Sequence, residues 1–175
     1  MSRSRTKERR SGASLTPVRW VLLIAGFLLF VVVCLAIYVR NADAEYRGEE
    51  RAATLKAKQE AGLASVREVT KHVWDEVVWV VEGEDETGVS WIVWERESGI
   101  VKEQASAGLT KKEIENRFET AHPGKPIARL LPGWFAGQAA WELRYVDDKA
   151  ADREAIDFYA FKDGAMLGTY DLPGK

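Results

Sequence analysis

Cysteine, histidine and proline are all scarce in this chain of 175 residues. It has one cysteine, two histidines and five prolines. A single cysteine excludes an intrachain disulfide, so any folded domain must be held together by its core alone. That cysteine, Cys34, lies inside a long apolar run, where it is unsuited to act as a nucleophile in water.

Recognisable catalytic and metal-binding patterns are also missing. Neither His72 nor His122 has a Cys, His or carboxylate at metal-ligand spacing, and no serine lies in a G-x-S-x-G elbow. Glu142 and Asp157 are candidates for a glycosidase pair, but carboxylates on alternating strands are ordinarily the solvated side of the strand. We therefore expect a non-enzyme with no metal, no cofactor and no catalytic residue.

A long apolar run is what the chain does have. The segment from Trp20 to Val39 contains no charge and no proline, and its 20 residues match the thickness of a bilayer core. Residues 1–19 form a basic tail, which the positive-inside rule places in the cytoplasm, and the rings of Trp20 and Tyr38 are expected to anchor the span at the headgroups. The sequence predicts a single-pass plasma-membrane protein with its C-terminal part outside the cell.

An alternative for this segment is a cleaved signal peptide. The string "ADA" at 42–44 has the small-x-small pattern of a cleavage site. The apolar region of a signal peptide is only about 7 to 15 residues long, which favours the membrane helix.

The segment that follows the apolar run is acidic. Residues 40–175 hold 19 Lys and Arg against 26 Asp and Glu, a net charge of −7. Such a surface repels phosphate polymers, so nucleic acid is not an expected partner. Protein partners remain open.

Residues 43–61 are rich in Ala, Glu, Lys and Arg and end before Gly62, which predicts a helix with a C-terminal cap. Its apolar positions are mostly alanine, and Leu55 is its one large apolar residue. Two interpretations stay open: a polar stalk above the bilayer, or a helix packed on the sheet that follows.

Short runs rich in Val and Trp follow between residues 65 and 104, which predicts an antiparallel meander. Val77, Trp79 and Val81 alternate with Val78 and Val80, so both faces of this strand are expected to meet protein. The acidic loop "EGEDETG" at 82–88 lacks the ligand spacing of a calcium loop. We interpret it as a solvated hairpin turn.

The second half repeats the order of a helix followed by strands. "TKKE" at 110–113 predicts a capping box that begins a helix ending near His122. Strands are expected at 126–135, 138–148, 153–164 and 165–172. The clearest is 138–148, where Trp141 and other large apolar residues alternate with polar ones.

The order of basic tail, single span, alanine-rich helix and two helix-plus-sheet units, with "GLTKKE" and "WELRYVDD" in the second unit, resembles the TseB/YpmB-like family. The resemblance implies an α+β fold of two tandem PepSY-like (cystatin-like) units, each a helix packed on a curled antiparallel sheet. The units would cover residues 40–105 and 106–175, after the tail at 1–19 and the transmembrane helix at 20–39.

The same resemblance implies a function. It predicts a regulator of cell-wall elongation in a Gram-positive bacterium, one that binds a penicillin-binding protein or another cell-wall synthesis membrane protein. Two alternatives remain: a PepSY-type module that restrains a peptidase, and a glycan-binding module that stacks sugars on an exposed Trp such as Trp94 or Trp134. The sequence does not identify the residues that contact a partner.

Overall fold

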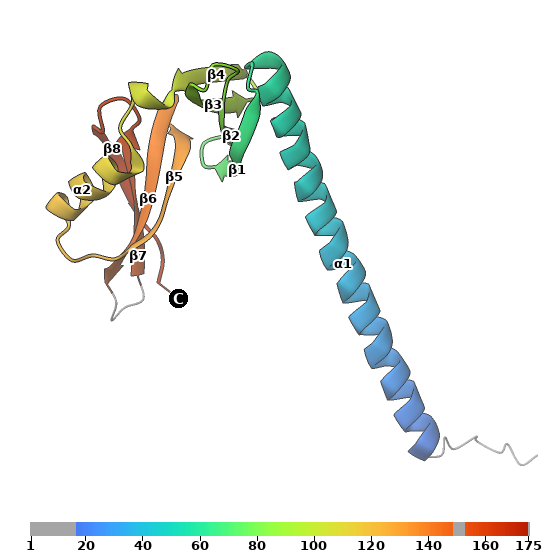
Figure 1. Cartoon of the computed structure of the whole chain (residues 1–175). Helices are drawn as coiled ribbons and strands as arrows, with labels where there is room; N and C mark the ends of the chain where they lie inside the picture. The colour runs from blue at the N-terminus through green and yellow to red at the C-terminus, as the bar shows by residue number, and fades with distance from the viewer. Residues whose placement is uncertain (1–16, 149–152, 175) are drawn as a thin grey trace, which may run out of the picture. The chain divides into compact units, whose positions relative to one another are not determined.

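The computed structural model describes residues 17–148 and 153–174. The chain folds into two compact units, Met1–Tyr46 and Arg47–Lys175. The elements, in chain order, are α1 (Pro17–Glu60), β1 (Ser65–Val73), β2 (Val77–Glu84), β3 (Ser90–Arg96), β4 (Gly99–Gln104), a 3-10 turn (Ala105–Ala107), α2 (Lys111–Ala121), β5 (Ile127–Phe135), β6 (Gln138–Asp148), β7 (Arg153–Ala160) and β8 (Met166–Asp171). Figure 1 labels the α-helices and strands along the ribbon.

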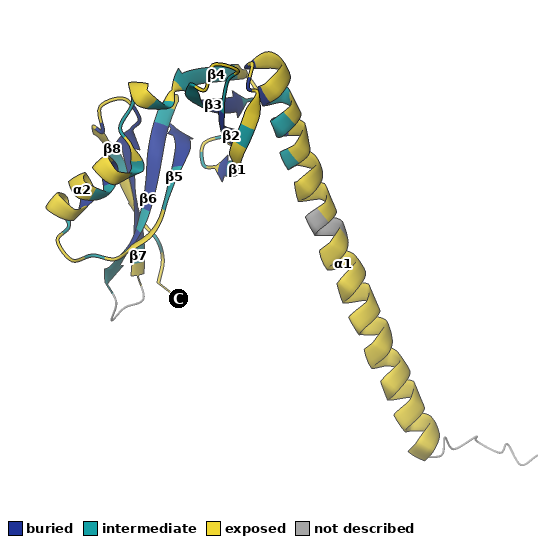
Figure 2. Cartoon of the chain, in the orientation of Figure 1, coloured by how far each residue is buried: buried dark blue, intermediate teal, exposed yellow. Residues whose placement is uncertain are grey.

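The helix α1 is continuous through both segments that the sequence predicts as helical. Its apolar N-terminal part has a mean hydropathy of 3.1 over its most apolar window, none of which is buried, and it qualifies as a candidate membrane span (Figure 2). Full exposure of such apolar residues suits contact with lipid. Of the basic flank, only Arg19 falls within the described residues; residues 1–16 lie outside them.

Within the unit Arg47–Lys175, called the second unit from here on, the last turns of α1 pack on the sheet β1–β4. The strands of this sheet pair antiparallel in sequence order. Ala53 and Ala57 of the helix are buried against Val81 and Val93 of the sheet. Alanine is small enough to let the helix backbone approach the strands closely. Leu55 points away and is 56% exposed, so alanines alone make the buried stripe, and the packed-helix interpretation holds for this end of α1.

The opposite face of the same sheet is also covered. Val78 and Val80 belong to a core that includes Ile114 and Phe118 of α2 and Trp141 of β6. Both faces of β2 therefore meet protein, as the alternation of its side chains predicts. The two halves of the sequence share one hydrophobic core instead of each closing its own.

The second half follows the predicted order. Thr110 caps α2: its side chain accepts a hydrogen bond from the Glu113 amide, and Glu113 accepts one from the Thr110 amide, which completes the capping box. Ile114 and Phe118 face the sheet β5–β8, which is antiparallel and in sequence order. The α+β prediction, with a helix on each of two antiparallel sheets, is confirmed.

A polar contact joins the two sheets. His72 of β1 is buried, and its Nε2 lies 2.9 Å from Oε2 of Glu142 in β6. The Trp134 amide donates to His72 Nδ1 at 3.4 Å. A Cβ on Gly133 would come within 2.5 Å of the imidazole, so glycine is required there for this approach.

The acidic loop forms the β2–β3 hairpin turn, as predicted, with Gly88 at a positive φ of 81°. Its acidic residues are not equivalent, however. Asp85 accepts hydrogen bonds from the Thr87 amide and hydroxyl, from the Val89 amide and from the Trp91 indole. The hydrogen bonds from Thr87 and Trp91 are the main cause of a strongly lowered pKa for this carboxyl. The expectation of a uniformly solvated acidic loop is therefore wrong at Asp85.

Candidate binding pocket

A pocket opens where α1 lies over the first sheet. The strand register places Lys71 opposite Trp79, and Trp79 opposite Glu95, so these three side chains form one row across β1, β2 and β3. The row is on the same face as Val81 and Val93, which the helix covers. The pocket therefore lies beside the alanine contact, one step along the strands.

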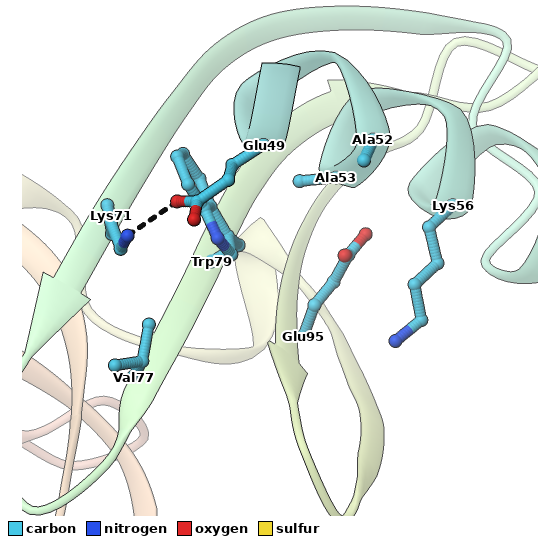
Figure 3. A pocket seen from close by; sticks show the side chains of 8 residues that line it. All are labelled: Glu49, Ala52, Ala53, Lys56, Lys71, Val77, Trp79 and Glu95. Atoms are coloured by element: carbon cyan, nitrogen blue, oxygen red, sulfur yellow. Dashed lines mark hydrogen bonds and ion pairs between the residues drawn. The ribbon is translucent and has the colours of Figure 1, made fainter. Parts of the chain in front are cut away.

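Helix residues complete the pocket, as Figure 3 shows. Its volume is about 430 Å³, within the range usual for small-ligand sites. The lining residues are Glu49, Ala52, Ala53, Lys56, Lys71, Val77, Trp79 and Glu95. The wall is thus apolar, from alanine, valine and an indole, and carries two acidic and two basic groups.

Two of these charged groups neutralise each other. Lys71 Nζ lies 2.5 Å from Glu49 Oε2, and the same ammonium stands 5.4 Å from the centre of the Trp79 ring. The ion pair links α1 to β1 at the edge of the pocket (Figure 3). It leaves Glu95 and Lys56 as the groups able to serve a ligand.

Glu95 is unusual for a charged side chain, because only 6% of it is exposed. Its side chain extends from β3 toward α1 (Figure 3). Among the described residues, its Oε1 atom has no hydrogen-bond partner. Burial raises the pKa of Glu95 to about 7, and the nearby Glu60 carboxylate adds to this effect. The charge of Lys56 and a hydrogen bond from the Ala57 amide act in the opposite direction and lower the pKa.

Val77 is an apolar and exposed residue of the pocket lining. It is 49% exposed, and its cross-strand partner Val73 is 60% exposed. Between them the chain turns at Trp74, whose ring packs 5.0 Å from both Phe158 and Tyr170 of the second sheet. The end of this hairpin is therefore held in place while its two valines face solvent.

The residues predicted to bind or anchor are placed as follows. Trp20 and Tyr38 are exposed near the two ends of the apolar part of α1, and their role as membrane anchors stays a prediction. Trp94 and Trp134 are buried, so the expectation that either offers an exposed ring to a sugar is wrong. The guanidinium of Arg96 stands 4.2 Å from the Trp134 ring and covers it.

The expectation that Glu142 and Asp157 form the wet side of their strands is also wrong. Glu142 is 4% exposed, accepts a hydrogen bond from Arg129 at 2.5 Å and faces His72. Burial acts to raise the pKa of Glu142, but the contacts with His72 and Arg129 outweigh burial, and the pKa is lowered. Asp157 is fully buried and accepts from Thr169 and Tyr159. Each carboxylate is thus engaged by its own partners inside the fold.

Asp157 also faces a histidine, since His122 Nε2 lies 3.2 Å from its Oδ2. His122 caps the C-terminus of α2 and stacks on Tyr145. Burial, with Asp157 adding to it, raises the pKa of Tyr145 to about 12. Within residues 17–148 and 153–174, no group of three or more His, Cys, Asp or Glu is placed to hold a metal ion.

Comparisons with known proteins bear on this architecture. Residues 52–94 match the cell wall elongation regulator TseB-like domain. The predicted resemblance to the TseB/YpmB-like family is confirmed. The YpmB protein from Bacillus subtilis has a similar fold, with a TM-score of 0.64 and 23% identity over 70% of this chain and 97% of that one. A comparison with curated protein sequences finds no match.

The TseB-like region covers the last turns of α1, the strands β1 and β2, and most of β3. It therefore includes most of the pocket lining, from Ala52 to Trp79, and stops one residue before Glu95. The sequence could not have revealed this pocket, because Glu95 meets Trp79 only through the β2–β3 register. The alternation in "SWIVWER" places Glu95 on a defined face of its strand. Without the partner strands, the sequence does not show which residues share that face.

Proposed function

We propose that this chain is a non-catalytic, membrane-anchored regulator of cell-wall elongation that acts outside the cytoplasm. The observation that carries the proposal is the match of residues 52–94 to the cell wall elongation regulator TseB-like domain. Both sheets are packed with side chains, and the buried carboxylates of the second sheet are engaged in structural contacts. A binding role fits this architecture better than a catalytic one.

The regulated protein, in this proposal, is a penicillin-binding protein or another membrane protein of cell-wall synthesis. The apolar part of α1 supports an anchor, because its length and hydropathy suit a single span. The basic residues before it favour a cytoplasmic N-terminus and an outward second unit at the plasma membrane. A partner in the same membrane is met in two dimensions, which raises effective concentration and lets weak contacts suffice.

The anchor can be tested by complementation in cells that lack the protein. Full-length protein and a version with residues 20–39 replaced by an unrelated span of equal length are expected to restore normal cell elongation. A secreted form of residues 41–175 is expected to fail at the same protein level. Full complementation by the secreted form would contradict the tethering argument and favour a diffusible inhibitor.

The span-exchange variant is the matched control, since it keeps the tether and changes only the residues that face lipid. If it loses function with normal level and topology, the span itself takes part in recognition. Protease added to protoplasts checks the topology: the second unit should be digested, whereas complete protection would contradict the outward orientation.

A further inference from the structure

Glu95 is a buried carboxylate with one oxygen atom left unpaired. It is 94% buried, lines an open pocket, and its Oε1 atom has no hydrogen-bond partner among the described residues. Burying an ionised carboxylate is costly unless a donor or a cation compensates it. A group of this kind indicates that the complement comes from outside the folded chain.

The nearby cations among the described residues do not supply that complement. Lys71 is held by Glu49 at 2.5 Å, on the far side of Trp79 from Glu95. Lys56 lies close enough to attract the Glu95 carboxylate, yet the carboxylate remains poorly compensated, and Glu60 opposes that attraction. The Glu95 carboxylate in the pocket lining is therefore available to an incoming donor.

The walls define the shape of a suitable donor. Ala52, Ala53, Val77 and the Trp79 indole present apolar surface in the same pocket as Glu95. Such a passage suits a long aliphatic stem with a charged end, since lysine and arginine side chains bury their methylenes along apolar surface. An indole face adds cation–π attraction for an ammonium or guanidinium.

We propose that this pocket receives a lysine or arginine side chain from the membrane protein that the chain regulates, with Glu95 as its counter-ion. The inference rests on the proposed function and names the recognition chemistry for it. The net charge of −7 on residues 40–175 favours the approach of a basic segment. Val77 in the lining and its cross-strand neighbour Val73 are exposed, and provide apolar contact for the residues that flank the inserted side chain.

A first experiment tests the pocket without any partner. Full-length protein in lipid nanodiscs, with alanine methyl groups labelled with carbon-13, is titrated with n-butylammonium chloride and, as a matched neutral probe, with 1-butanol. We expect the Ala52 and Ala53 methyl shifts to change with n-butylammonium and not with 1-butanol. The variant Glu95→Gln keeps the shape of the side chain and should abolish the change.

Equal shifts with both probes, no shifts at all, or ammonium-induced shifts that persist in Glu95→Gln would each overturn the proposal. A second variant sharpens the test. At about pH 9, where Glu95 is ionised and an alkylammonium is still charged, Lys56→Gln removes a competing cation and is expected to strengthen n-butylammonium binding about twofold or more, within the range of surface charge effects. Weaker binding in Lys56→Gln would contradict the assignment of Glu95 as the counter-ion.

A second experiment, in cells, separates this inference from the proposed function. A photo-crosslinking amino acid is placed at Val77, beside the pocket, or at Tyr170, an exposed residue of β8, in the full-length protein. We expect Val77 to capture a cell-wall synthesis membrane protein and Glu95→Gln to reduce the product about tenfold or more, as for a truncated buried charge pair.

Capture from Val77 that Glu95→Gln leaves unchanged, or capture from Tyr170 but not from Val77, would overturn the pocket while the proposed function stands. Capture of no cell-wall protein from either position would contradict both. Protein levels and urea midpoints of the Glu95→Gln variant confirm that a lost product does not reflect unfolding.

Discussion

His72 of the first sheet and Glu142 of the second lie 2.9 Å apart, Nε2 to Oε2, and both side chains are almost fully buried. His72 Nδ1 accepts a hydrogen bond from the Trp134 amide, and its Nε2 faces the Glu142 carboxylate. The imidazole thus lies between a backbone amide and a carboxylate, across the two halves of the chain.

Replacing Glu142 by Gln should lower the free energy of unfolding by about 1–3 kcal/mol at pH 7, because a buried donor loses its charged acceptor. The pKa of Glu142 is lowered in the folded protein, so its contribution is present above about pH 4.5 and is lost as pH falls through the folded pKa. Urea unfolding of residues 41–175 from pH 7 to pH 3 measures this. The difference between wild type and variant should shrink on acidification.

Glu115→Gln is the matched control for that measurement, since within the described part of the chain Glu115 makes only an exposed pair with Lys112 on α2. Its effect at pH 7 should stay below about 1 kcal/mol. A wild-type advantage over Glu142→Gln that grows as pH falls would contradict the sign of the linkage.

Asp85→Asn should lower the urea midpoint, whereas Glu86→Gln, in the same turn, should leave it unchanged. The physical reason is that Asp85 accepts four hydrogen bonds that fix the β2–β3 turn, and Glu86 is exposed. The pKa of Asp85 is far below its usual range, so its contribution should persist well below pH 4. Equal effects of Asp85→Asn and Glu86→Gln on the urea midpoint would contradict a structural role for Asp85 and support a uniformly solvated turn.

Trp141→Ala should destabilise residues 41–175 by about 3–5 kcal/mol, the usual cost of emptying a buried aromatic site. Trp141 is 3% exposed, and its indole donates to the Leu109 carbonyl at 3.0 Å. Leu55→Ala is the control, because Leu55 is 56% exposed and should cost less than about 1 kcal/mol. Circular dichroism during urea unfolding reports both without depending on the lost indole.

Glu95→Gln should stabilise the protein above pH 7, the opposite direction from the other core changes. The pKa of Glu95 is raised to about 7, so its protonated form favours folding and stability declines as pH rises from about 4.5 through 7. We expect a gain of about 1–2 kcal/mol at pH 8, less than the full linkage value because the pocket is open to solvent.

Lys56 and Glu60 face Glu95 from α1 with opposite effects, and both are kept in the variant. Urea unfolding at pH 5 and pH 8 decides the outcome, with the gain present at pH 8 and small at pH 5. A loss of stability at pH 8 would mean that Glu95 is structural, and would remove its availability to a ligand.

Much of the fold could be predicted from local patterns. Thr110 and Glu113 identify the start of α2 by their spacing, and the alternation of Val77 to Val81 predicts that both faces of β2 are covered. These signals lie within a few residues of one another along the chain. The local structure that they predict therefore depends little on contacts with distant parts of the chain.

The polar interior could not be predicted in this way. Glu142 alternates with apolar neighbours as a solvated residue would, yet it is buried where it faces His72, 70 positions away in the sequence. Trp94 and Trp134 are likewise covered by the packing of one sheet against the other. Glu95 belongs to the same class, since its pocket exists only where α1 crosses the strand register.

The proposed function requires that the chain contacts a membrane protein of cell-wall synthesis. Photo-crosslinking of the full-length protein in living cells, from exposed positions on both sheets, followed by mass spectrometry, is the decisive measurement. We predict a penicillin-binding protein or another cell-wall synthesis membrane protein as the main covalent product. Products that contain only peptidases, or no cell-wall synthesis protein at all, would contradict the account.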